Sequence, residues 1–345
     1  MKSWMRHIAI LAALAVVLSP LFFIIDRVMV FDAVPHDDYA PFLLWLIGAP
    51  GGVFPASPYG YRILTMLAAL PFYYGLPAFR LTNLPASLDP HYLQATAAIA
   101  ALSYLSLLGS GLLAYRTARD RADLARCCST FAGIILCTLT LYSQIFGIDS
   151  FAILLVAAGV FLLSRPVGFT AVIAASVFAN EKVAIVFAIW LTLRCVCSTA
   201  DRALFRAQLI ATYGAIIVYG LALLVLHLRG NDYQLEPGGY LGTVMSNLRA
   251  SVSIRGLLLN VLAVAVLLAV GGAGWRYAGR ARIAMFRPLD LLVVPGLVLV
   301  AMTLTQMFQT GRIVMHAAPL FVLPAAVAIG RWMDVKSPPS VRPDA

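Results

Sequence analysis

Long apolar runs are the feature that most constrains how this chain can fold. The longest measure about 20 residues, the length that a helix needs to cross a hydrocarbon core of about 30 Å. They lie near residues 7–25, 93–115, 127–146, 207–228, 257–275, 288–309 and 313–330. Shorter apolar runs, whose length alone does not assign them to a crossing, lie at 61–79, 150–164, 167–179 and 183–197.

Composition places these runs in a membrane protein. Only 12% of the residues are charged and 61% are apolar, whereas soluble domains carry about 25% charged residues. The first run is longer than a signal-peptide core and no small-residue cleavage site follows it, so we interpret it as an uncleaved first span. The net charge of +10 then reflects basic cytoplasmic loops, and no nucleic-acid partner is predicted.

The basic loops fix a predicted topology. The positive-inside rule places them in the cytoplasm together with the N-terminus, so an even number of crossings must separate each pair. The loops are 116–126, 194–206, 276–287 and the tail from Arg331. This parity makes 61–79 a helix at the outer interface and 167–197 two short spans hinged at Asn180-Glu181-Lys182. One continuous helix would bury Lys182 near the bilayer centre. Inserting a lysine there costs about 2.5–3.5 kcal/mol of free energy.

The predicted fold is therefore an all-α polytopic membrane bundle with about ten transmembrane helices (a range of about 9–11). Both termini are expected in the cytoplasm. Residues 1–335 form one transmembrane domain, whose outer loop, 26–92, carries interfacial helices near 39–48 and 58–79. The tail 336–345 is predicted to be disordered because of its proline and serine content. The five cysteines lack metal-ligand spacing and are expected to be small apolar residues.

This topology collects ionisable residues on the outer side. Ionisable groups at span ends around one face are typical of a functional site. The candidates are His36, Asp37 and Asp38 in "VPHDDYAPF", Arg62 in "YGYRIL", Asp149 in "FGIDSF", Glu181 and Lys182 in "ANEKVA", and Arg312 and His316 in "QMFQTGRIVMH".

Several candidates also have a purely structural interpretation, which is weakest for Arg312 because a two-residue turn does not need a guanidinium. Asp38 and Asp149 could cap the helices that follow them, because aspartate is favoured at N-caps. Glu181 and Lys182 could solvate the tip of a helical hairpin, although spans of this length would leave that tip below the membrane surface. A histidine such as His316 is more often satisfied within the fold than a ligand. The convergence of these residues is better evidence for a site than any single member.

The arrangement resembles the GT-C superfamily of integral membrane glycosyltransferases, which use polyprenyl-phosphate-linked sugars. The matching elements are the first span, the acidic "PHDDY" stretch and the helices of the outer loop. The stretches "YGYRIL", "ANEKVAIV" and "GRIVMHAAPLFVLP" are similar to Tyr-Arg, Arg/Lys-Glu and Gly-Arg stretches of bacterial members. Two features depart from the family: "NEK" reverses the order of the basic-acid pair, and no large outer domain follows the last span.

The resemblance implies transfer of a sugar to an envelope acceptor on the outer face of a bacterial inner membrane. Asp37 or Asp38 would be the base that takes the proton of the acceptor hydroxyl, as inverting transfer requires. The other acid would orient the base or bind a divalent cation such as Mg or Mn. The cations Arg62, Lys182 and Arg312 would hold the lipid phosphate. The other substrate-binding candidates are His36, Asp149, Glu181 and His316.

Other functional classes fit parts of the same pattern. A transporter or flippase for a lipid-linked or anionic substrate would use the outer cations without a base, but matching repeats of the kind common in transporters are not found in the sequence. A polysaccharide polymerase or ligase would also act on lipid-linked sugars. An inert membrane scaffold would not require buried charges on one face.

Overall fold

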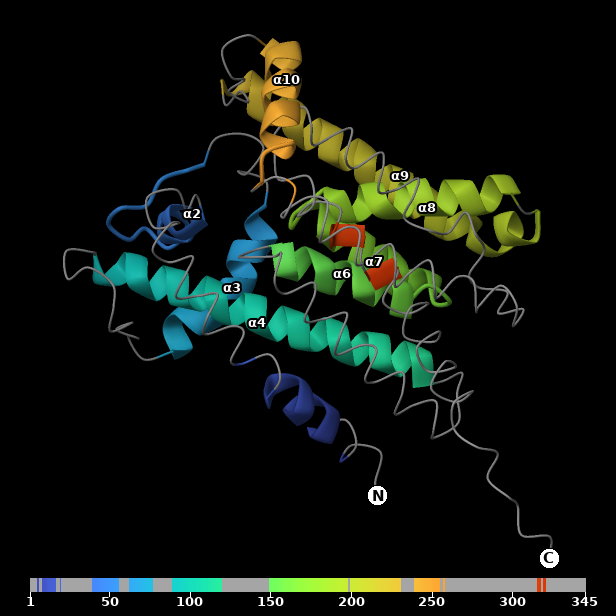
Figure 1. Cartoon of the computed structure of the whole chain (residues 1–345), viewed down its shortest axis with the longest axis horizontal. Coiled ribbons are helices and arrows are strands. Elements are labelled where there is room, and N and C mark those ends of the chain that lie inside the picture. Colours follow the sequence, from blue (N-terminus) through green and yellow to red (C-terminus); the bar gives the residue numbers. More distant parts are fainter. Residues whose placement is uncertain are drawn as a thin grey trace, which may run out of the picture.

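The computed structural model describes several stretches of the 345-residue chain (Figure 1). These are residues 5, 8–16, 19, 39–55, 62–76, 89–119, 149–197, 199–230, 239–254, 257, 315–317 and 319–320. Helices and their connecting turns make up these stretches, and none of the described residues lies in a strand. The all-α class is therefore confirmed for this part of the chain.

The helices have the following bounds. They are α2 (Tyr39–Leu46), α3 (Ile63–Gly75), α4 (Pro90–Arg119), α6 (Asp149–Phe161), α7 (Pro166–Val177), α8 (Lys182–Cys197), α9 (Thr199–Leu228), α10 (Gly239–Ser251) and the 3₁₀ turn η4 (Met315–Ala317). The predicted spans 127–146 and 288–309, and nearly all of 257–275, lie outside the described residues. Of the first span, residues 8–16 are helical.

Two of the described helices are long and apolar enough to cross a membrane, Pro90–Leu113 within α4 and Arg202–Leu228 within α9. Ten spans are not shown. The large apolar side chains of α9 face outward along much of its length, among them Ile210, Ile217 and Leu221. An exposed apolar face of this kind is typical of a surface that contacts lipid or another protein.

Three other helices are too short to cross on their own. α6, α7 and α8 contain 13, 12 and 16 residues, fewer than the about 20 residues that a crossing needs. The predicted break within 167–197 is confirmed, because α7 ends at Val177 and α8 begins at Lys182. The two helices fold back on each other so that the rings of Phe169 and Phe187 meet at 5.1 Å in a T-shaped contact.

α4 runs past two groups of helices, α2 and α3 near its start and α6 farther along (Figure 1). Its first half packs against α2 and α3 through a buried cluster that includes Phe42, Met66 and Leu102. Its second half packs against α6. A Cβ atom on Gly109 of α4 would lie 2.9 Å from Leu154 Cδ1 of α6, and the guanidinium of Arg116 lies 5.5 Å from the centre of the Phe161 ring.

These two contacts also give the register between α4 and α6. From the first contact to the second, the position in α4 moves from 109 to 116 and the position in α6 from 154 to 161. Both helices therefore advance by seven residues in the same direction, which means that they run parallel and side by side. Asp149, the first residue of α6, is therefore level with about Tyr104 of α4. At 1.5 Å per residue, α6 begins about 21 Å along α4 from Pro90. The start of α6 thus lies beside the middle of α4 (Figure 1).

The helices predicted for the outer loop are present, and each buries part of its surface against α4. α2 and α3 fall within the predicted ranges 39–48 and 58–79. Phe42 and Met66 are both fully buried, and Arg62, which immediately precedes α3, is 4% exposed. Packing against α4 therefore accounts for the apolar side chains on the buried faces of these two helices.

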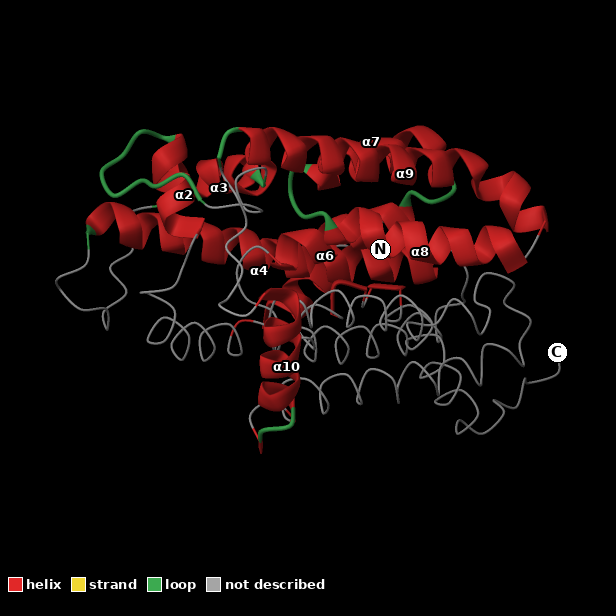
Figure 2. Ribbon diagram, turned by 90° about the horizontal axis from the view of Figure 1, so that it is seen from above, coloured by secondary structure: helices red, strands yellow, loops and turns green. Residues whose placement is uncertain are grey.

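Two elements differ from the pattern expected from sequence. The basic segment 194–206 is almost entirely helical, since α8 ends at Cys197 and α9 begins at Thr199. Arg194 is buried there next to two aromatic rings. Its guanidinium carbon lies 5.8 Å from the centre of the Trp190 ring and 5.6 Å from the centre of the Phe205 ring. The sequence did not predict α10, which stands across the direction of α4 (Figure 2).

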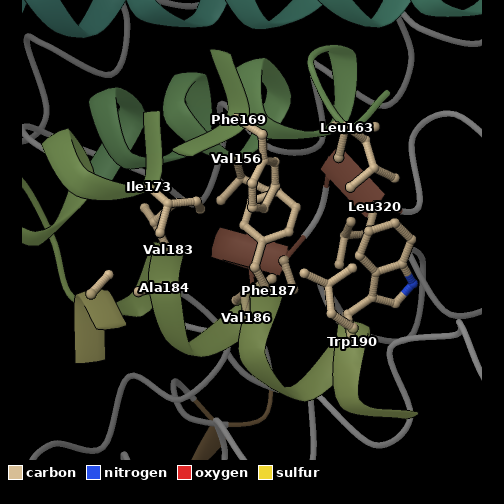
Figure 3. Close-up of a cluster of buried hydrophobic side chains, with 14 of the residues drawn as sticks. Val156, Leu163, Phe169, Ile173, Val183, Ala184, Val186, Phe187, Trp190 and Leu320 are labelled. Atoms are coloured by element: carbon tan, nitrogen blue, oxygen red, sulfur yellow. The ribbon is translucent and has the colours of Figure 1, made fainter. Parts of the chain in front are cut away.

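The main core lies between α6, α7 and α8 (Figure 3). Phe169, Phe187 and Trp190 form its aromatic centre, and Leu320 joins it from the C-terminal part of the chain. Cys195 is a free thiol buried in the same core, as expected of a small apolar residue. At Gly159 the backbone of α6 approaches α8 so closely that an added Cβ atom would lie 2.5 Å from Phe187 Cζ.

Gly159→Ala is expected to lower the free energy of unfolding by about 1–3 kcal/mol, because the new methyl group would displace the buried Phe187 ring. The control is Gly214→Ala in α9, where an added Cβ atom meets nothing within 4 Å and alanine is the better helix former. Thermal unfolding of both variants in the same detergent measures the difference. Equal melting temperatures would contradict the close approach of α6 and α8.

Candidate functional site

A buried ion pair joins the start of α3 to the turn between α7 and α8. The Nη2 atom of Arg62 donates to both carboxylate oxygens of Glu181, at 2.9 Å each. The Nη1 atom donates to the hydroxyl of Tyr39 at 3.3 Å. Arg62 and Glu181 are 4% and 8% exposed, so this is a charge-assisted contact in a largely water-free environment.

Backbone contacts fix the geometry of this ion pair. The first N–H groups of a helix and its last C=O groups lack partners within the helix. Here the Leu64 N–H of α3 donates to the Phe178 carbonyl after α7 at 2.8 Å. The Thr65 hydroxyl donates to the Ala179 carbonyl at 3.3 Å. The start of α3 and the end of α7 therefore satisfy each other, and the side chains of Arg62 and Glu181 are held face to face.

Asn180 caps the helix that carries Lys182. Its Oδ1 atom accepts a hydrogen bond from the Lys182 N–H at 3.1 Å, which is the contact of an N-cap residue. Asn180 itself is fully buried, and its Nδ2 atom makes no hydrogen bond in the structure described. The hinge is therefore an ordered turn inside the protein, whereas the solvated hairpin tip considered from sequence would be exposed.

A second buried pair links α6 to the C-terminal part of the chain. His316 Nε2 lies 3.0 Å from Asp149 Oδ1, and both side chains are at most 3% exposed. His316 lies on η4, which packs against both α6 and α8. Ser150 follows Asp149 and is fully buried, and its hydroxyl has no hydrogen-bond partner among the described residues.

The two pairs lie in one region, which we call the junction: Arg62, Asp149, Ser150, Asn180, Glu181 and His316. Three observations place them together. The start of α6 lies beside the middle of α4, and α3 packs against the first half of the same helix (Figure 1). Phe151, in the first turn of α6, packs against the cluster formed by α2, α3 and α4. η4 contacts α8 as well as α6.

The structure thus brings together four of the residues selected from sequence, as two buried pairs: the ion pair of Arg62 with Glu181, and the hydrogen-bonded pair of Asp149 with His316. Lys182 follows directly and is partly buried at the start of α8. His36, Asp37, Asp38 and Arg312 lie outside the described residues. No cluster of three or more His, Cys, Asp or Glu side chains occurs in the described part, and the acids predicted to hold a cation, Asp37 and Asp38, are not in it.

Sequence reasoning missed three participants. Tyr39, Ser150 and Asn180 are uncharged, and a search for ionisable residues passes over them. Their positions carried a usable signal, since Tyr39 follows Asp38, Ser150 follows Asp149 and Asn180 precedes Glu181. A polar residue next to an acid, within an apolar chain, is a candidate for the same buried network.

A further polar group lies where α3 ends beside the start of α4. Asp89 Oδ1 accepts the His91 N–H at 2.8 Å, and His91 Nδ1 lies 3.0 Å from the Tyr73 hydroxyl. Burial raises the pKa of Tyr73, with smaller contributions from Tyr74 and Asp89, so this hydroxyl is protonated at neutral pH. These contacts, with the Gln94 amide bound to the carbonyls of Tyr73 and Leu76, secure the end of α3.

The electrostatics of the junction are largely compensated internally. The charge of Arg62 is balanced by Glu181, and Asp149 shares a hydrogen bond with His316. Buried charges that are paired in this way hold elements in register and are costly to separate. The arrangement can therefore position neighbouring groups within a dry environment, where any electrostatic interaction is stronger than in water.

No protein-family model, no curated protein and no solved structure matches this chain.

Proposed function

We propose that this protein is a multi-pass inner-membrane glycosyltransferase with both termini in the cytoplasm. It would transfer a sugar from a polyprenyl-phosphate donor to an envelope acceptor. The observation that carries the proposal is the bridge made by Arg62, which hydrogen bonds to Tyr39 and to Glu181 at once. This bridge connects the two stretches of sequence to which opposite halves of the reaction were assigned.

The chain on either side of the bridge supports this assignment. Asp38 immediately precedes Tyr39 and Lys182 immediately follows Glu181, and consecutive Cα atoms are only about 3.8 Å apart. An acid suited to activate a hydroxyl and a cation suited to a phosphate are therefore each one residue from the same guanidinium contact. Such convergence across 119 positions of sequence supports one shared site.

The reaction would divide between these groups as follows. Asp37 or Asp38 takes the proton from the acceptor hydroxyl while that oxygen attacks the anomeric carbon of the donor. The bond from that carbon to the phosphate oxygen breaks, and the lipid phosphate leaves with the bonding electrons. Lys182 and Arg312 stabilise its negative charge. Arg62 is already balanced by Glu181 and acts as a positioning residue that holds the acidic stretch against the turn before α8.

A transporter of a lipid-linked substrate is the second candidate, and the short helices favour it. α6 begins at the junction, beside the middle of α4, and α8 begins at the turn that carries Glu181, so neither helix crosses the full length of α4. Interrupted helices that end at buried polar groups near the membrane midplane are common in transporters. Such a protein would move the intact lipid between leaflets and would not need a base.

A reconstituted assay separates the two candidates. Purified protein in vesicles is given a polyprenyl-phosphate hexose labelled in the sugar, together with envelope extract as the source of acceptor. The proposal predicts that the label enters a new glycoside and that polyprenyl phosphate is released in equal amount. Protein-free vesicles are the control. Intact labelled lipid in the opposite leaflet, with no new glycoside, would instead establish the transporter.

A further inference from the structure

Two polar side chains in the junction are buried without a hydrogen-bond partner. They are Ser150, through Oγ, and Asn180, through Nδ2, and both residues are 0% exposed. Nearly all buried polar groups in proteins are hydrogen-bonded, so such atoms call for a ligand, a water molecule or an ion. They are not isolated defects, because each is next in sequence to a member of one of the two buried pairs, Asp149–His316 or Arg62–Glu181.

Their positions in the fold give them a common character. Ser150 lies in the first turn of α6, and Asn180 caps the first turn of α8. The start of a helix presents N–H groups and a partial positive charge, and so attracts hydrogen-bond acceptors. The amide of Asn180 is fixed by its Oδ1 contact with the Lys182 N–H, which leaves Nδ2 at the same helix end as a donor only. The Ser150 hydroxyl can donate or accept.

The local charges limit what such a ligand can be. Asp149 and Glu181 are both carboxylates, and each is already paired inside the junction. An additional phosphate placed between them would be repelled in a region of low dielectric constant. A neutral group that offers both acceptor and donor hydroxyls would satisfy Asn180 and Ser150 and leave the pairs intact.

We propose that Ser150 and Asn180 form a binding subsite for the hydroxyl groups of the hexose carried by the lipid donor. This inference rests on the proposed function and extends it, because it separates the sugar subsite from the phosphate ligands Lys182 and Arg312. The sugar would then be bound level with the middle of α4, about 21 Å along that helix from Pro90.

Ser150→Ala and Asn180→Ser test this subsite in the full-length protein. Asn180→Ser keeps a neutral side-chain oxygen that can cap α8, and it removes the Nδ2 donor without adding a charge beside Lys182. The Kd of each protein is measured in detergent for two kinds of lipid. One is polyprenyl-phosphate hexose, in its glucose, mannose and galactose forms, and the other is polyprenyl phosphate without a sugar. Each variant is expected to weaken the Kd of the preferred hexose lipid by about 2–12-fold, the equivalent of one ordinary hydrogen bond, with the Kd of polyprenyl phosphate unchanged.

Ser176→Ala is the matched control, since Ser176 is equally buried but its hydroxyl already donates to the Ile173 carbonyl at 2.7 Å. It should reduce thermal stability and leave both Kd values unchanged. Ser150→Ala should not reduce stability in the absence of lipid, because it removes a buried hydroxyl that has no hydrogen-bond partner in the structure described.

Three results would overturn the subsite. The first is an equal loss of affinity for both lipids, and the second is no loss for either, which would mean that the two atoms bind water only. The third is a wild-type protein that binds every hexose lipid as tightly as polyprenyl phosphate. If the variants lost affinity for the hexose lipid alone and the wild-type protein formed no glycoside, the subsite would stand and the proposed transferase activity would be wrong. If the variants bound both lipids and transferred sugar like the wild type, only the subsite would be wrong.

Discussion

Arg62→Ala is expected to lower the free energy of unfolding by about 3–5 kcal/mol, because it breaks a buried ion pair by removing one of its members. The Glu181 carboxylate would lose both of its 2.9 Å contacts with the guanidinium. Its remaining surroundings are inside the protein, since Glu181 is only 8% exposed. Denaturant unfolding in a fixed detergent measures the loss.

Two further variants make this result specific. Arg165→Ala removes an exposed arginine at the start of α7 and should change stability by less than about 0.5 kcal/mol. The double variant Arg62→Met with Glu181→Leu replaces both charges by apolar groups and should recover most of the loss, as apolar replacements of buried pairs commonly do. If Arg62→Ala were as stable as Arg165→Ala, the ion pair would not hold the start of α3 in place.

Asp37→Asn and Asp38→Asn are expected to reduce sugar transfer by about 10²–10⁴-fold, the usual contribution of a general base. Asparagine is nearly isosteric with aspartate and caps helices as well, so expression and melting temperature should stay close to wild type. Initial rates of glycoside formation from polyprenyl-phosphate hexose measure the effect.

Asp89→Asn is the control for this pair. Asp89 belongs to the same predicted outer loop, and its carboxylate caps the start of α4 by accepting the His91 N–H at 2.8 Å. Its amide variant should transfer sugar at the wild-type rate. Wild-type rates for both Asp37→Asn and Asp38→Asn would make the acidic stretch structural and remove the main support for a transferase.

Helix positions were largely predictable, because the long apolar runs are helical wherever the structure describes most of their residues. The runs at 93–115, 150–164 and 183–197 correspond closely to α4, α6 and α8. The break at Asn180 was predictable too, since a continuous helix would place Glu181 and Lys182 inside an apolar segment. α10 was not predictable in this way, because its sequence, "GYLGTVMSNLRAS", has no long apolar run.

Partners within the site were not predictable from local sequence. Arg62 was selected as a phosphate ligand, but the structure shows its guanidinium bound to Glu181, 119 residues later. His316 was selected as a substrate-binding candidate, and the structure places its Nε2 atom 3.0 Å from Asp149 Oδ1, 167 residues earlier. Charge and position in the sequence identified the unusual side chains. Which of them meet depends on tertiary packing, of α3 on the turn after α7 for one pair and of η4 on α6 for the other.

The long separation between the partners in each pair has a consequence for biogenesis. At about 5–20 residues per second, roughly 6–24 s pass between the synthesis of Arg62 and that of Glu181, 119 residues later. Asp149 waits longer still, since His316 is 167 residues away. Until those partners emerge from the ribosome, a nascent chain must keep an arginine and an aspartate near water or in the insertion machinery. The junction is therefore completed late, and its last contact comes from the C-terminal tenth of the chain.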